Sequence, residues 1–275
     1  MKKGNLCMGK IYAISYGTEA YKKGLMLNVK SAYKHGADYA IPFNPDDIDK
    51  NFYTQNIRFF EEKKGGGYWL WKPYIIDKTL AAMEYGDWLL YVDAGLFYIN
   101  DIRQYISEAE SENITFVLTS TIYKEYQYTK RDVFIATDTD YDYIRNTAQR
   151  QSGALIIKKT EENIRFIKEW LYYIQKDKLV TDAPNELGKA NYDGFVENRH
   201  DQSILSVLSK KWNIGVERKL YDPNARTMWS SEKLLCYHHT ANGNKAIIWL
   251  KSLIGPAFHK VEDIFRKNER QKDFQ

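Results

Sequence analysis

Residues 88–95 read Trp-Leu-Leu-Tyr-Val-Asp-Ala-Gly, an apolar run that ends in a carboxylate and a glycine turn. A short apolar run bounded in this way is typical of a fully buried strand in a parallel sheet. Strand and helix patterns alternate on both sides of it, which predicts an α/β sandwich with a mainly parallel central sheet flanked by helices. Ligands of such sheets bind beyond the carboxyl ends of the strands, so Asp93 lies where a site is expected.

The remaining elements follow from the same patterns. Short apolar runs predict strands at residues 10–16, 39–43, 114–119 and 154–158. Apolar residues at helical spacing predict helices at residues 19–35, 49–64, 71–85, 161–176 and 201–211. Gly36 is expected to end the first helix, and the run Gly65-Gly66-Gly67 is expected to end the second.

Composition narrows the class of protein. The chain has 275 residues, of which 44% are apolar and 28% charged, and this supports a packed core rather than disorder. No apolar run reaches the roughly 20 residues of a membrane-spanning helix. Cys7 and Cys236 are too few for a disulfide framework or a cysteine zinc site, so a reducing cytoplasm is the expected compartment. A net charge of +4 is too small to indicate nucleic acid binding.

Aromatic residues make up 15% of the chain, including 22 tyrosines and 7 tryptophans. Their rings stack on sugars and bases while offering a polar edge, which favours carbohydrate or nucleotide ligands. The densest group follows the three glycines, where Trp69, Trp71 and Lys72 stand together. One stacking ring, assigned to Trp71, and the Lys72 charge at a helix start suit a nucleotide diphosphate. The alternative is an ordinary aromatic core with the lysine solvated.

Polar residues recur where predicted strands end or helices begin. Asp93 can ligate Mg²⁺ or Mn²⁺ through hard carboxylate oxygens, or it can simply cap the turn. Ser152 and Gly153 precede a predicted strand, where the glycine allows close approach of a ligand or only marks a turn. Asp201 and Gln202 begin a predicted helix, where their polar side chains could bind a ligand. The alternative is that Asp201 only caps the helix.

A last polar cluster, residues 236–245, contains His238, His239 and Lys245. A histidine near the end of the chain can complete the coordination of a metal ion, and a lysine after a glycine turn can pair with phosphate. Adjacent histidines on a strand point to opposite faces, so at most one of them faces a site. A surface loop without a ligand is the alternative.

Two common nucleotide-binding signatures are absent. After the first predicted strand, Ser15 and Tyr16 are followed by the single glycine Gly17, so the chain has no Gly-x-Gly-x-x-Gly fingerprint there. A P-loop ending in Gly-Lys-Ser/Thr is absent as well. Classical dinucleotide enzymes and P-loop ATPases are therefore disfavoured.

Taken in order, these segments resemble the motifs of GT-A nucleotide-sugar glycosyltransferases. The pattern is that of the glycogenin and lipopolysaccharide galactosyltransferase group: Tyr-x-Asp-Ala-Asp, Asn-Ala/Ser-Gly-Val, Asp-Gln-Asp-x-Leu-Asn and His-Phe-x-Gly-x-x-Lys-Pro-Trp. The matching segments are residues 91–95, 151–154, 201–206 and 238–245. Residues 68–73 and 87–95 also resemble bacterial capsule and O-antigen transferases. The resemblance implies a GT-A, Rossmann-like fold and a hexosyltransferase activity.

The resemblance also implies roles for individual residues. Asp201 and Gln202 would lie near the anomeric carbon or the acceptor, with inverting and retaining reactions both open. Asp93, with His238 or His239, would hold a divalent cation, Mn²⁺ or Mg²⁺. Donor binding would involve Ser15, Tyr16, Trp71, Lys72, Ser152, Gly153 and Lys245.

The sequence departs from the family pattern at three places. Gly95 stands where the second aspartate of the metal motif is expected, so cation binding would rest on fewer protein ligands or be dispensable. Ser203 replaces the second aspartate of Asp-Gln-Asp, and the terminal Lys-Pro-Trp is reduced to Lys245.

The expected reaction transfers a hexosyl unit from a nucleotide-diphosphate sugar, with a UDP-sugar favoured. The acceptor would be a saccharide or lipid-linked glycan of bacterial-type surface polysaccharide, capsule or lipopolysaccharide. Residues 1–245 would form a single GT-A catalytic domain. Residues 246–275 would form a C-terminal helical segment that either lies on the inner face of the membrane or packs on the domain. A non-catalytic carbohydrate-binding module and a nucleotidyltransferase that makes a sugar nucleotide are the competing interpretations.

Overall fold

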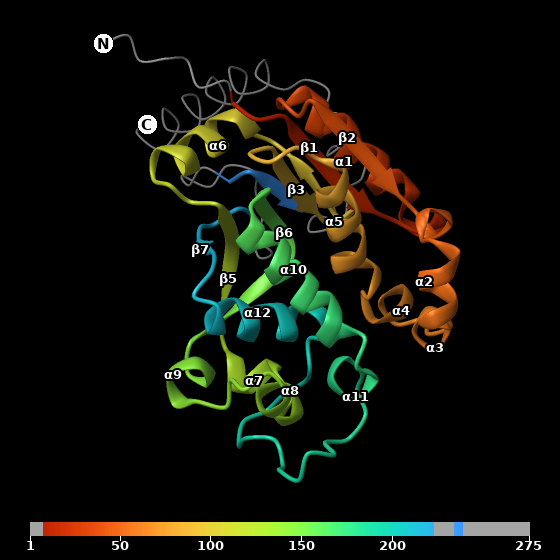
Figure 1. Cartoon of the computed structure of the whole chain (residues 1–275), viewed down its shortest axis with the longest axis vertical. Coiled ribbons are helices and arrows are strands. Elements are labelled where there is room, and N and C mark those ends of the chain that lie inside the picture. The colour runs from red at the N-terminus through yellow and green to blue at the C-terminus, as the bar shows by residue number, and fades with distance from the viewer. Residues whose placement is uncertain (1–7, 223–233, 239–275) are drawn as a thin grey trace, which may run out of the picture.

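The computed structural model describes residues 8–222 and 234–238 of the chain. A six-stranded sheet lies at its centre (Figure 1), with the order β2 (Tyr39–Phe43), β1 (Ile11–Tyr16), β3 (Trp88–Val92), β6 (Ala148–Lys158), β5 (Phe116–Lys124) and β7 (Val216–Glu217). β1 runs parallel to β2 and β3, and β5 runs parallel to β7. β6 is antiparallel to both of its neighbours, β3 and β5. The sheet is therefore mainly parallel, as predicted.

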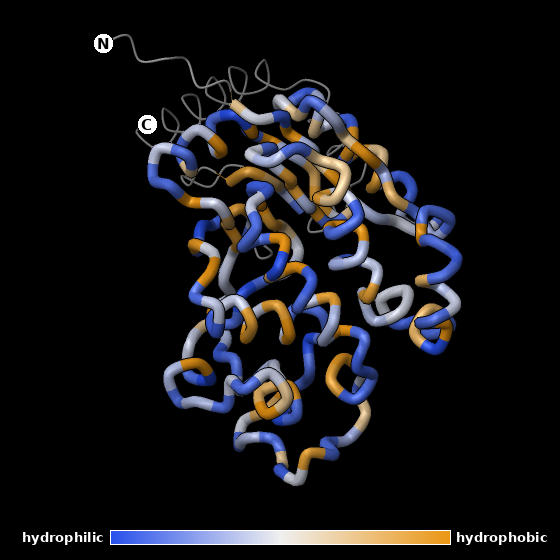
Figure 2. The backbone as a smooth tube through the Cα atoms, in the orientation of Figure 1, coloured by the Kyte–Doolittle hydropathy of each residue, from blue (hydrophilic) through white to orange (hydrophobic). Residues whose placement is uncertain are grey.

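Helices cover both faces of this sheet (Figure 1). α1 (Lys22–Lys34) and α6 (Ile102–Ser111) pack on one face, and α5 (Trp71–Ala82), α10 (Glu161–Ile174) and α12 (Asp201–Lys211) pack on the other. Side chains alternate along each strand. Leu89 and Tyr91 of β3 therefore pack against α5, α10 and α12, while Leu90 and Val92 pack against α1 and α6. Figure 2 shows hydrophobic and hydrophilic residues alternating along the covering helices, as one buried face requires.

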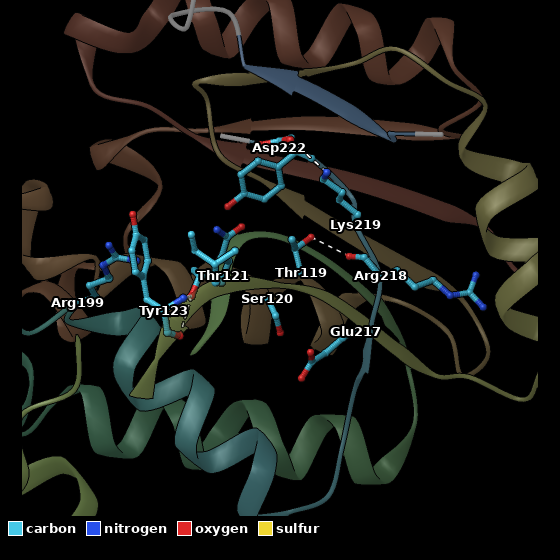
Figure 3. A pocket seen from close by; sticks show the side chains of 12 residues that line it. Thr119, Ser120, Thr121, Tyr123, Arg199, Glu217, Arg218, Lys219 and Asp222 are labelled. Atoms are coloured by element: carbon cyan, nitrogen blue, oxygen red, sulfur yellow. Dashed lines mark hydrogen bonds and ion pairs between the residues drawn. The ribbon is translucent and has the colours of Figure 1, made fainter. Parts of the chain in front are cut away.

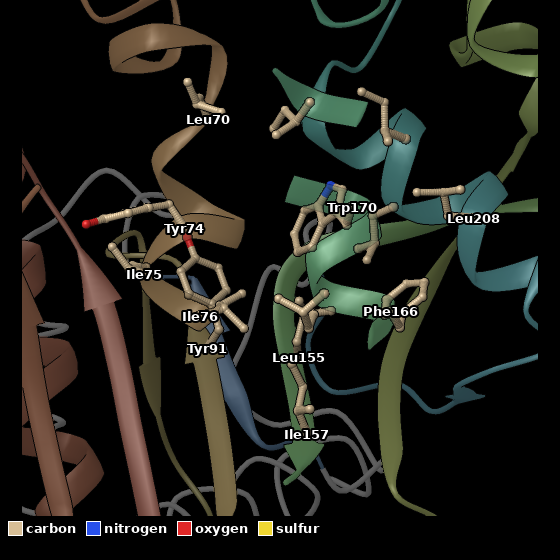
Figure 4. Close-up of a cluster of buried hydrophobic side chains, with 14 of the residues drawn as sticks. Leu70, Tyr74, Ile75, Ile76, Tyr91, Leu155, Ile157, Phe166, Trp170 and Leu208 are labelled. Atoms are coloured by element: carbon tan, nitrogen blue, oxygen red, sulfur yellow. The ribbon is translucent and has the colours of Figure 1, made fainter. Parts of the chain in front are cut away.

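The larger hydrophobic core lies between the sheet and the layer of α5, α10 and α12. Figure 4 shows its centre, where Leu155 and Ile157 of β6 lie beside Phe166 and Trp170 of α10. All four side chains are fully buried. The Trp170 indole also donates to the Asp201 carbonyl at 3.1 Å, which ties α10 to the first residue of α12.

Shorter elements connect these layers. They are η1 (Glu19–Tyr21), η2 (Pro45–Asp47), α2 (Lys50–Gln55), α3 (Ile57–Phe60), α4 (Gly65–Tyr68), α7 (Glu125–Tyr128), α8 (Arg131–Ala136), α9 (Asp142–Arg145) and α11 (Asp177–Val180). A two-stranded sheet pairs β4 (Leu96–Tyr98) with β8 (Cys236–His238). No helix in the two described ranges is long and apolar enough to cross a membrane.

Several predicted boundaries are correct. The strands at 39–43 and 88–92 and the helix at 201–211 match the structure residue for residue. The helix predicted at 49–64 is wrong, because Asn56 adopts a non-helical conformation between α2 and α3 and no helix continues past Phe60 until α4. The strand predicted at 154–158 begins earlier, at Ala148, because its first residues pair with the outer half of β5, residues 119–124.

Truncation of a core leucine tests this description of the core. Leu155→Ala removes a fully buried side chain between the sheet and α10, and we expect it to lower the free energy of unfolding by about 2–5 kcal/mol. Leu187→Ala is the matched control, because Leu187 is 47% exposed and its truncation should cost less than about 0.5 kcal/mol. Urea unfolding of both variants measures the difference, and equal losses would contradict the assigned core.

Candidate active site

A buried lysine joins two carboxylates at the carboxyl end of β3. Lys72 Nζ lies 2.8 Å from Asp201 Oδ2, 3.1 Å from Ser152 Oγ and 3.5 Å from Asp93 Oδ1. Ser152 donates its hydroxyl hydrogen to the same Asp201 oxygen at 2.7 Å. The three N–H bonds of Lys72 thus have three oxygens to face, each from a different element of the fold.

Burial decides the charge balance of this cluster. The Lys72 side chain is 2% exposed and that of Asp201 is 6% exposed, whereas Asp93 is 40% exposed. Burial lowers the pKa of the Lys72 ammonium, but the carboxylates of Asp201 and Asp93 raise it by more, so the net shift is upward. Lys72 is therefore a permanent cation that holds two carboxylates in place, one buried and one facing solvent.

The turn after β3 is fixed from three directions. Asn28 of α1 donates its side-chain amide to the carbonyls of Val92, Asp93 and Leu96, the last at 3.0 Å. Asp93 N donates to the Gly153 carbonyl at 2.9 Å. The Tyr91 hydroxyl donates to Asp93 Oδ1, and burial, followed by the charge of Asp93, raises the pKa of Tyr91 well above its usual value. Asp93 is thus presented in a defined position rather than on a mobile loop.

Gly153 is needed because two polar groups approach its backbone. A Cβ atom at this position would lie 2.6 Å from Tyr221 Oη and 3.1 Å from Asp93 Oδ2. The first distance is shorter than real Cβ contacts, so any other residue would displace Tyr221. Tyr221 is 8% exposed, and its burial raises the pKa of its hydroxyl, which therefore stays protonated. No motif in the sequence singles out Tyr221, which follows β7 far along the chain.

The start of α12 brings Asp201 and Gln202 to the same place. Gln202 donates to Gln149 Oε1 at 2.7 Å. His200, just before the helix, has φ 54° and ψ −117°, a strained conformation for a residue with a side chain. Its Nδ1 lies 2.7 Å from the Val180 carbonyl. Backbone strain of this kind concentrates at functional sites.

These residues surround a cleft of about 330 Å³. It is lined by Lys64, Trp69, Lys72, Asp93, Ser152, Gly153, Glu197, Asn198, Arg199, His200, Asp201, Gln202 and Tyr221. Three of the lining side chains are cationic and three are acidic, so the formal charge of the lining is balanced. The expected residues Asp93, Ser152, Gly153, Asp201 and Gln202 are therefore brought together.

Trp69 rather than Trp71 faces this cleft, which corrects the expectation from the sequence. Trp71 is 6% exposed, stacks on Tyr16 with ring centroids 3.9 Å apart, and donates its indole N–H to the Gly65 carbonyl. Residues 65–69 all have positive φ, and this left-handed turn directs the Trp69 ring onto His200 at 5.3 Å. The glycines permit most of the turn, but Tyr68 and Trp69 adopt it against their preference.

Ser15 and Tyr16 are also placed differently from expectation. Both are buried, and neither is among the residues that line the cleft. Burial and the nearby Asp47 raise the pKa of Tyr16 to about 12. The Tyr16 ring belongs to the core through its stack on Trp71, so we correct its assignment from a donor-binding residue to a packing residue.

His238 is the second candidate metal ligand that the structure describes. β8 pairs His238 with Leu96, and a Cβ atom at Gly95 would lie 3.4 Å from His238 Nε2. The imidazole therefore faces the turn that carries Asp93. Within residues 8–222 and 234–238, no three histidine, cysteine, aspartate or glutamate side chains gather into a metal-binding set. His239 and Lys245 lie outside the described residues.

The structure of this chain is similar to several solved structures of glycosyltransferases. WbbM, a bifunctional glycosyltransferase, is 9% identical with a TM-score of 0.46 over 78% of this chain, and the chain spans only 40% of that protein. Mouse xyloside xylosyltransferase 1 is 10% identical with a TM-score of 0.43, covering 83% of this chain and 97% of that one. GlyE of Streptococcus pneumoniae TIGR4 is 18% identical with a TM-score of 0.45, covering 94% and 64%. No family model and no curated protein sequence matches the chain.

Removal of the Lys72 charge tests the role of the buried cluster. Lys72→Met leaves the Asp201 carboxylate buried without its cation, and we expect a loss of about 3–5 kcal/mol in the free energy of unfolding at pH 7. Chemical unfolding at pH 7 measures this loss.

Lys64→Met is the matched control, because Lys64 forms an exposed ion pair with Asp182. Such a pair contributes about 0–1 kcal/mol, so the control should unfold almost as the wild type does. A Lys72→Met loss no larger than that of the control would contradict the buried ion pair.

Proposed function

We propose that this protein is a glycosyltransferase that moves a sugar from a nucleotide-diphosphate donor, with a UDP-sugar favoured, to a saccharide or lipid-linked glycan acceptor. One observation carries the proposal: Lys72 joins Asp93 and Asp201 at the carboxyl end of β3 beside an open cleft. In α/β sheets this edge is where ligands bind. The order of the motifs along the chain, which resembles that of GT-A transferases, supports the same assignment.

The charge balance of the cleft bears on how a diphosphate would bind. Asp201 and Asp93 already surround the Lys72 charge, so Lys72 acts as a positioning residue and offers no free N–H bond to phosphate. A diphosphate next to these carboxylates therefore needs another source of positive charge. The other two cations of the lining, Lys64 and Arg199, are paired with Asp182 and Glu197. A divalent cation would supply the charge, because carboxylate and phosphate oxygens are the ligands that Mg²⁺ and Mn²⁺ prefer.

The residues present fit such a cation. The Asp93 carboxylate is 40% exposed, its Oδ1 is held by Tyr91 and Lys72, and His238 faces the same turn. Asp93 and His238 would supply two ligands, with phosphate oxygens and water completing the shell. When bound, the cation would neutralise the charge of the departing diphosphate.

The proposed transfer makes one bond and breaks one bond. The acceptor hydroxyl oxygen bonds to the anomeric carbon, while the bond from that carbon to the diphosphate oxygen breaks and leaves its electron pair on the diphosphate. The hydroxyl proton goes to the departing diphosphate in a front-side reaction or to Asp201 in an inverting one. Asp201 Oδ2 already accepts from Ser152 and Lys72, which favours a positioning role for Asp201 and hence the front-side reaction.

We also propose that the acceptor belongs to the synthesis of bacterial-type surface polysaccharide, capsule or lipopolysaccharide. The enzyme would act in the cytoplasm. The segment 246–275, proposed to contact the membrane surface, lies outside the described residues.

Donor turnover tests the proposed function. We expect one member of a panel of UDP-, GDP- and CMP-sugars to be hydrolysed or transferred in the presence of Mn²⁺. Asp93→Asn should lower this turnover at least 100-fold, because the amide is a poor cation ligand. Asp193→Asn is the control, since Asp193 is exposed and does not line the cleft. Binding of saccharides without binding of any nucleotide sugar would contradict the proposal and favour a carbohydrate-binding module.

Gly95 offers a gain-of-function test of the cation site. A Cβ atom there makes ordinary contact with His238, so Gly95→Asp is sterically allowed and would place a second carboxylate beside Asp93 and the imidazole. We expect the concentration of Mn²⁺ at half-maximal turnover to fall at least fivefold in this variant. Unchanged Mn²⁺ dependence in a folded variant would contradict a cation at this turn.

A further inference from the structure

A second and larger cavity, of about 660 Å³, opens beside the cleft. We call it the outer cavity. Its lining comes from the outer half of β5, from residues 217–222, and from Gln151 and Arg199: Thr119, Ser120, Thr121, Ile122, Tyr123, Gln151, Arg199, Glu217, Arg218, Lys219, Tyr221 and Asp222. Figure 3 shows Thr119, Ser120 and Thr121 between Arg199 and Tyr123 on one side and Lys219 on the other. Its volume is that of a small-molecule site.

The charged groups of the outer cavity are paired with one another or with neighbours. Arg218 donates to Glu112, and Figure 3 shows its side chain extending away from the other labelled residues. Lys219 pairs with Asp222 at 3.2 Å, and Glu217 accepts from Arg150 at 3.0 Å. The hydroxyls of Thr119 and Thr121 donate to the backbone carbonyls of Arg218 and Tyr123. The side-chain atoms left for a ligand are neutral polar ones, which suits a polyhydroxylated ligand better than an anion.

Two buried polar atoms in the lining, Gln151 Oε1 and Ser120 Oγ, lack a hydrogen-bond partner among the described residues. Gln151 is 7% exposed. A buried carbonyl oxygen without a donor is costly, so such atoms are usually satisfied by water or by a ligand. A sugar hydroxyl entering the outer cavity is a donor of the required kind.

The cavity also offers an aromatic surface at its rim. The Tyr123 ring is 39% exposed, and the Arg199 guanidinium lies 5.2 Å from its centroid and 3.8 Å from that of Tyr128. These cation–π contacts hold Arg199 and Tyr123 beside each other. An exposed tyrosine ring next to hydroxyl and amide groups is suited to the apolar face of a sugar ring.

The outer cavity and the cleft meet at two shared residues. Arg199 and Tyr221 line both. Tyr221 Oη lies against Gly153, on the side where Asp93 Oδ2 also lies. A ligand in the outer cavity therefore extends toward the carboxylates of the cleft rather than into a separate part of the molecule.

We propose that the outer cavity binds the acceptor as a neutral saccharide, with Gln151 Oε1 accepting a hydrogen bond from one of its hydroxyls and Tyr123 packing against its ring. This inference rests on the proposed function, since it assigns the second substrate of the same reaction. Gln151 would then help to select the acceptor, and the donor would bind in the cleft.

Kinetics of the full-length chain test the proposal. The donor is the nucleotide sugar that the wild type turns over, and the acceptors are methyl hexosides, neutral hexose oligosaccharides and a methyl glucuronide. Gln151→Leu should raise the KM for the neutral acceptor about tenfold, the effect of one lost hydrogen bond. Donor KM and donor hydrolysis without acceptor should remain within twofold. Gln104→Leu, on the exposed face of α6, is the matched control and should change neither value.

A second variant covers the case in which Gln151→Leu fails to fold. Tyr123→Ala removes a rim side chain and should also raise the acceptor KM selectively. An unchanged acceptor KM in both variants, an equal rise of the donor KM, or preference of the wild type for the glucuronide would overturn the assignment.

Direct binding separates this inference from the proposed function. Calorimetry of the neutral oligosaccharide without donor should show binding to the wild type and at least fivefold weaker binding to Tyr123→Ala. If no nucleotide sugar binds or turns over but this saccharide binding is found, the proposed function fails while the saccharide site stands. If donor turnover is found but the saccharide neither binds nor accepts sugar, the outer-cavity assignment alone fails.

Discussion

The contact of Lys72 with Asp201 and Asp93 is the interaction on which the rest of the site depends. It joins α5 to α12 and to the turn after β3, and Ser152 adds β6 to the same cluster. Burying a lone charge at this depth would be strongly unfavourable, so Lys72 and Asp201 each require the other. The helix that carries Lys72 and the helix that begins at Asp201 are thereby held at one edge of the sheet.

This cluster also determines what the cleft can bind. With its one buried cation already paired, the cleft offers carboxylates, hydroxyls and an open Asp93 rather than a ready anion site. On the function we propose, a nucleotide sugar would need a cation to enter, while a neutral saccharide in the outer cavity would need none. Tyr221, which lies directly against the backbone of Gly153, and Arg199 line both spaces.

The sequence predicts the central elements well and the irregular ones poorly. The strand at 88–92 and the helix at 201–211 carry strong local patterns, and their ends bring Asp93 and Asp201 to the site as expected. Trp69 could not be told from Trp71, because the choice depends on the left-handed turn at 65–69, which no hydrophobic period encodes. Lys72 was expected at a diphosphate, but its carboxylate partners come from elements that only the tertiary fold brings together.

The location of a bound cation and diphosphate is the most direct test of this account. A crystal structure with Mn²⁺ and UDP should show anomalous density for manganese within about 2.0–2.4 Å of an Asp93 carboxylate oxygen, with the diphosphate on the same ion. The Lys72 ammonium should remain on Asp201 in that complex. UDP bound directly by Lys72, or manganese bound away from the turn at Asp93, would contradict it.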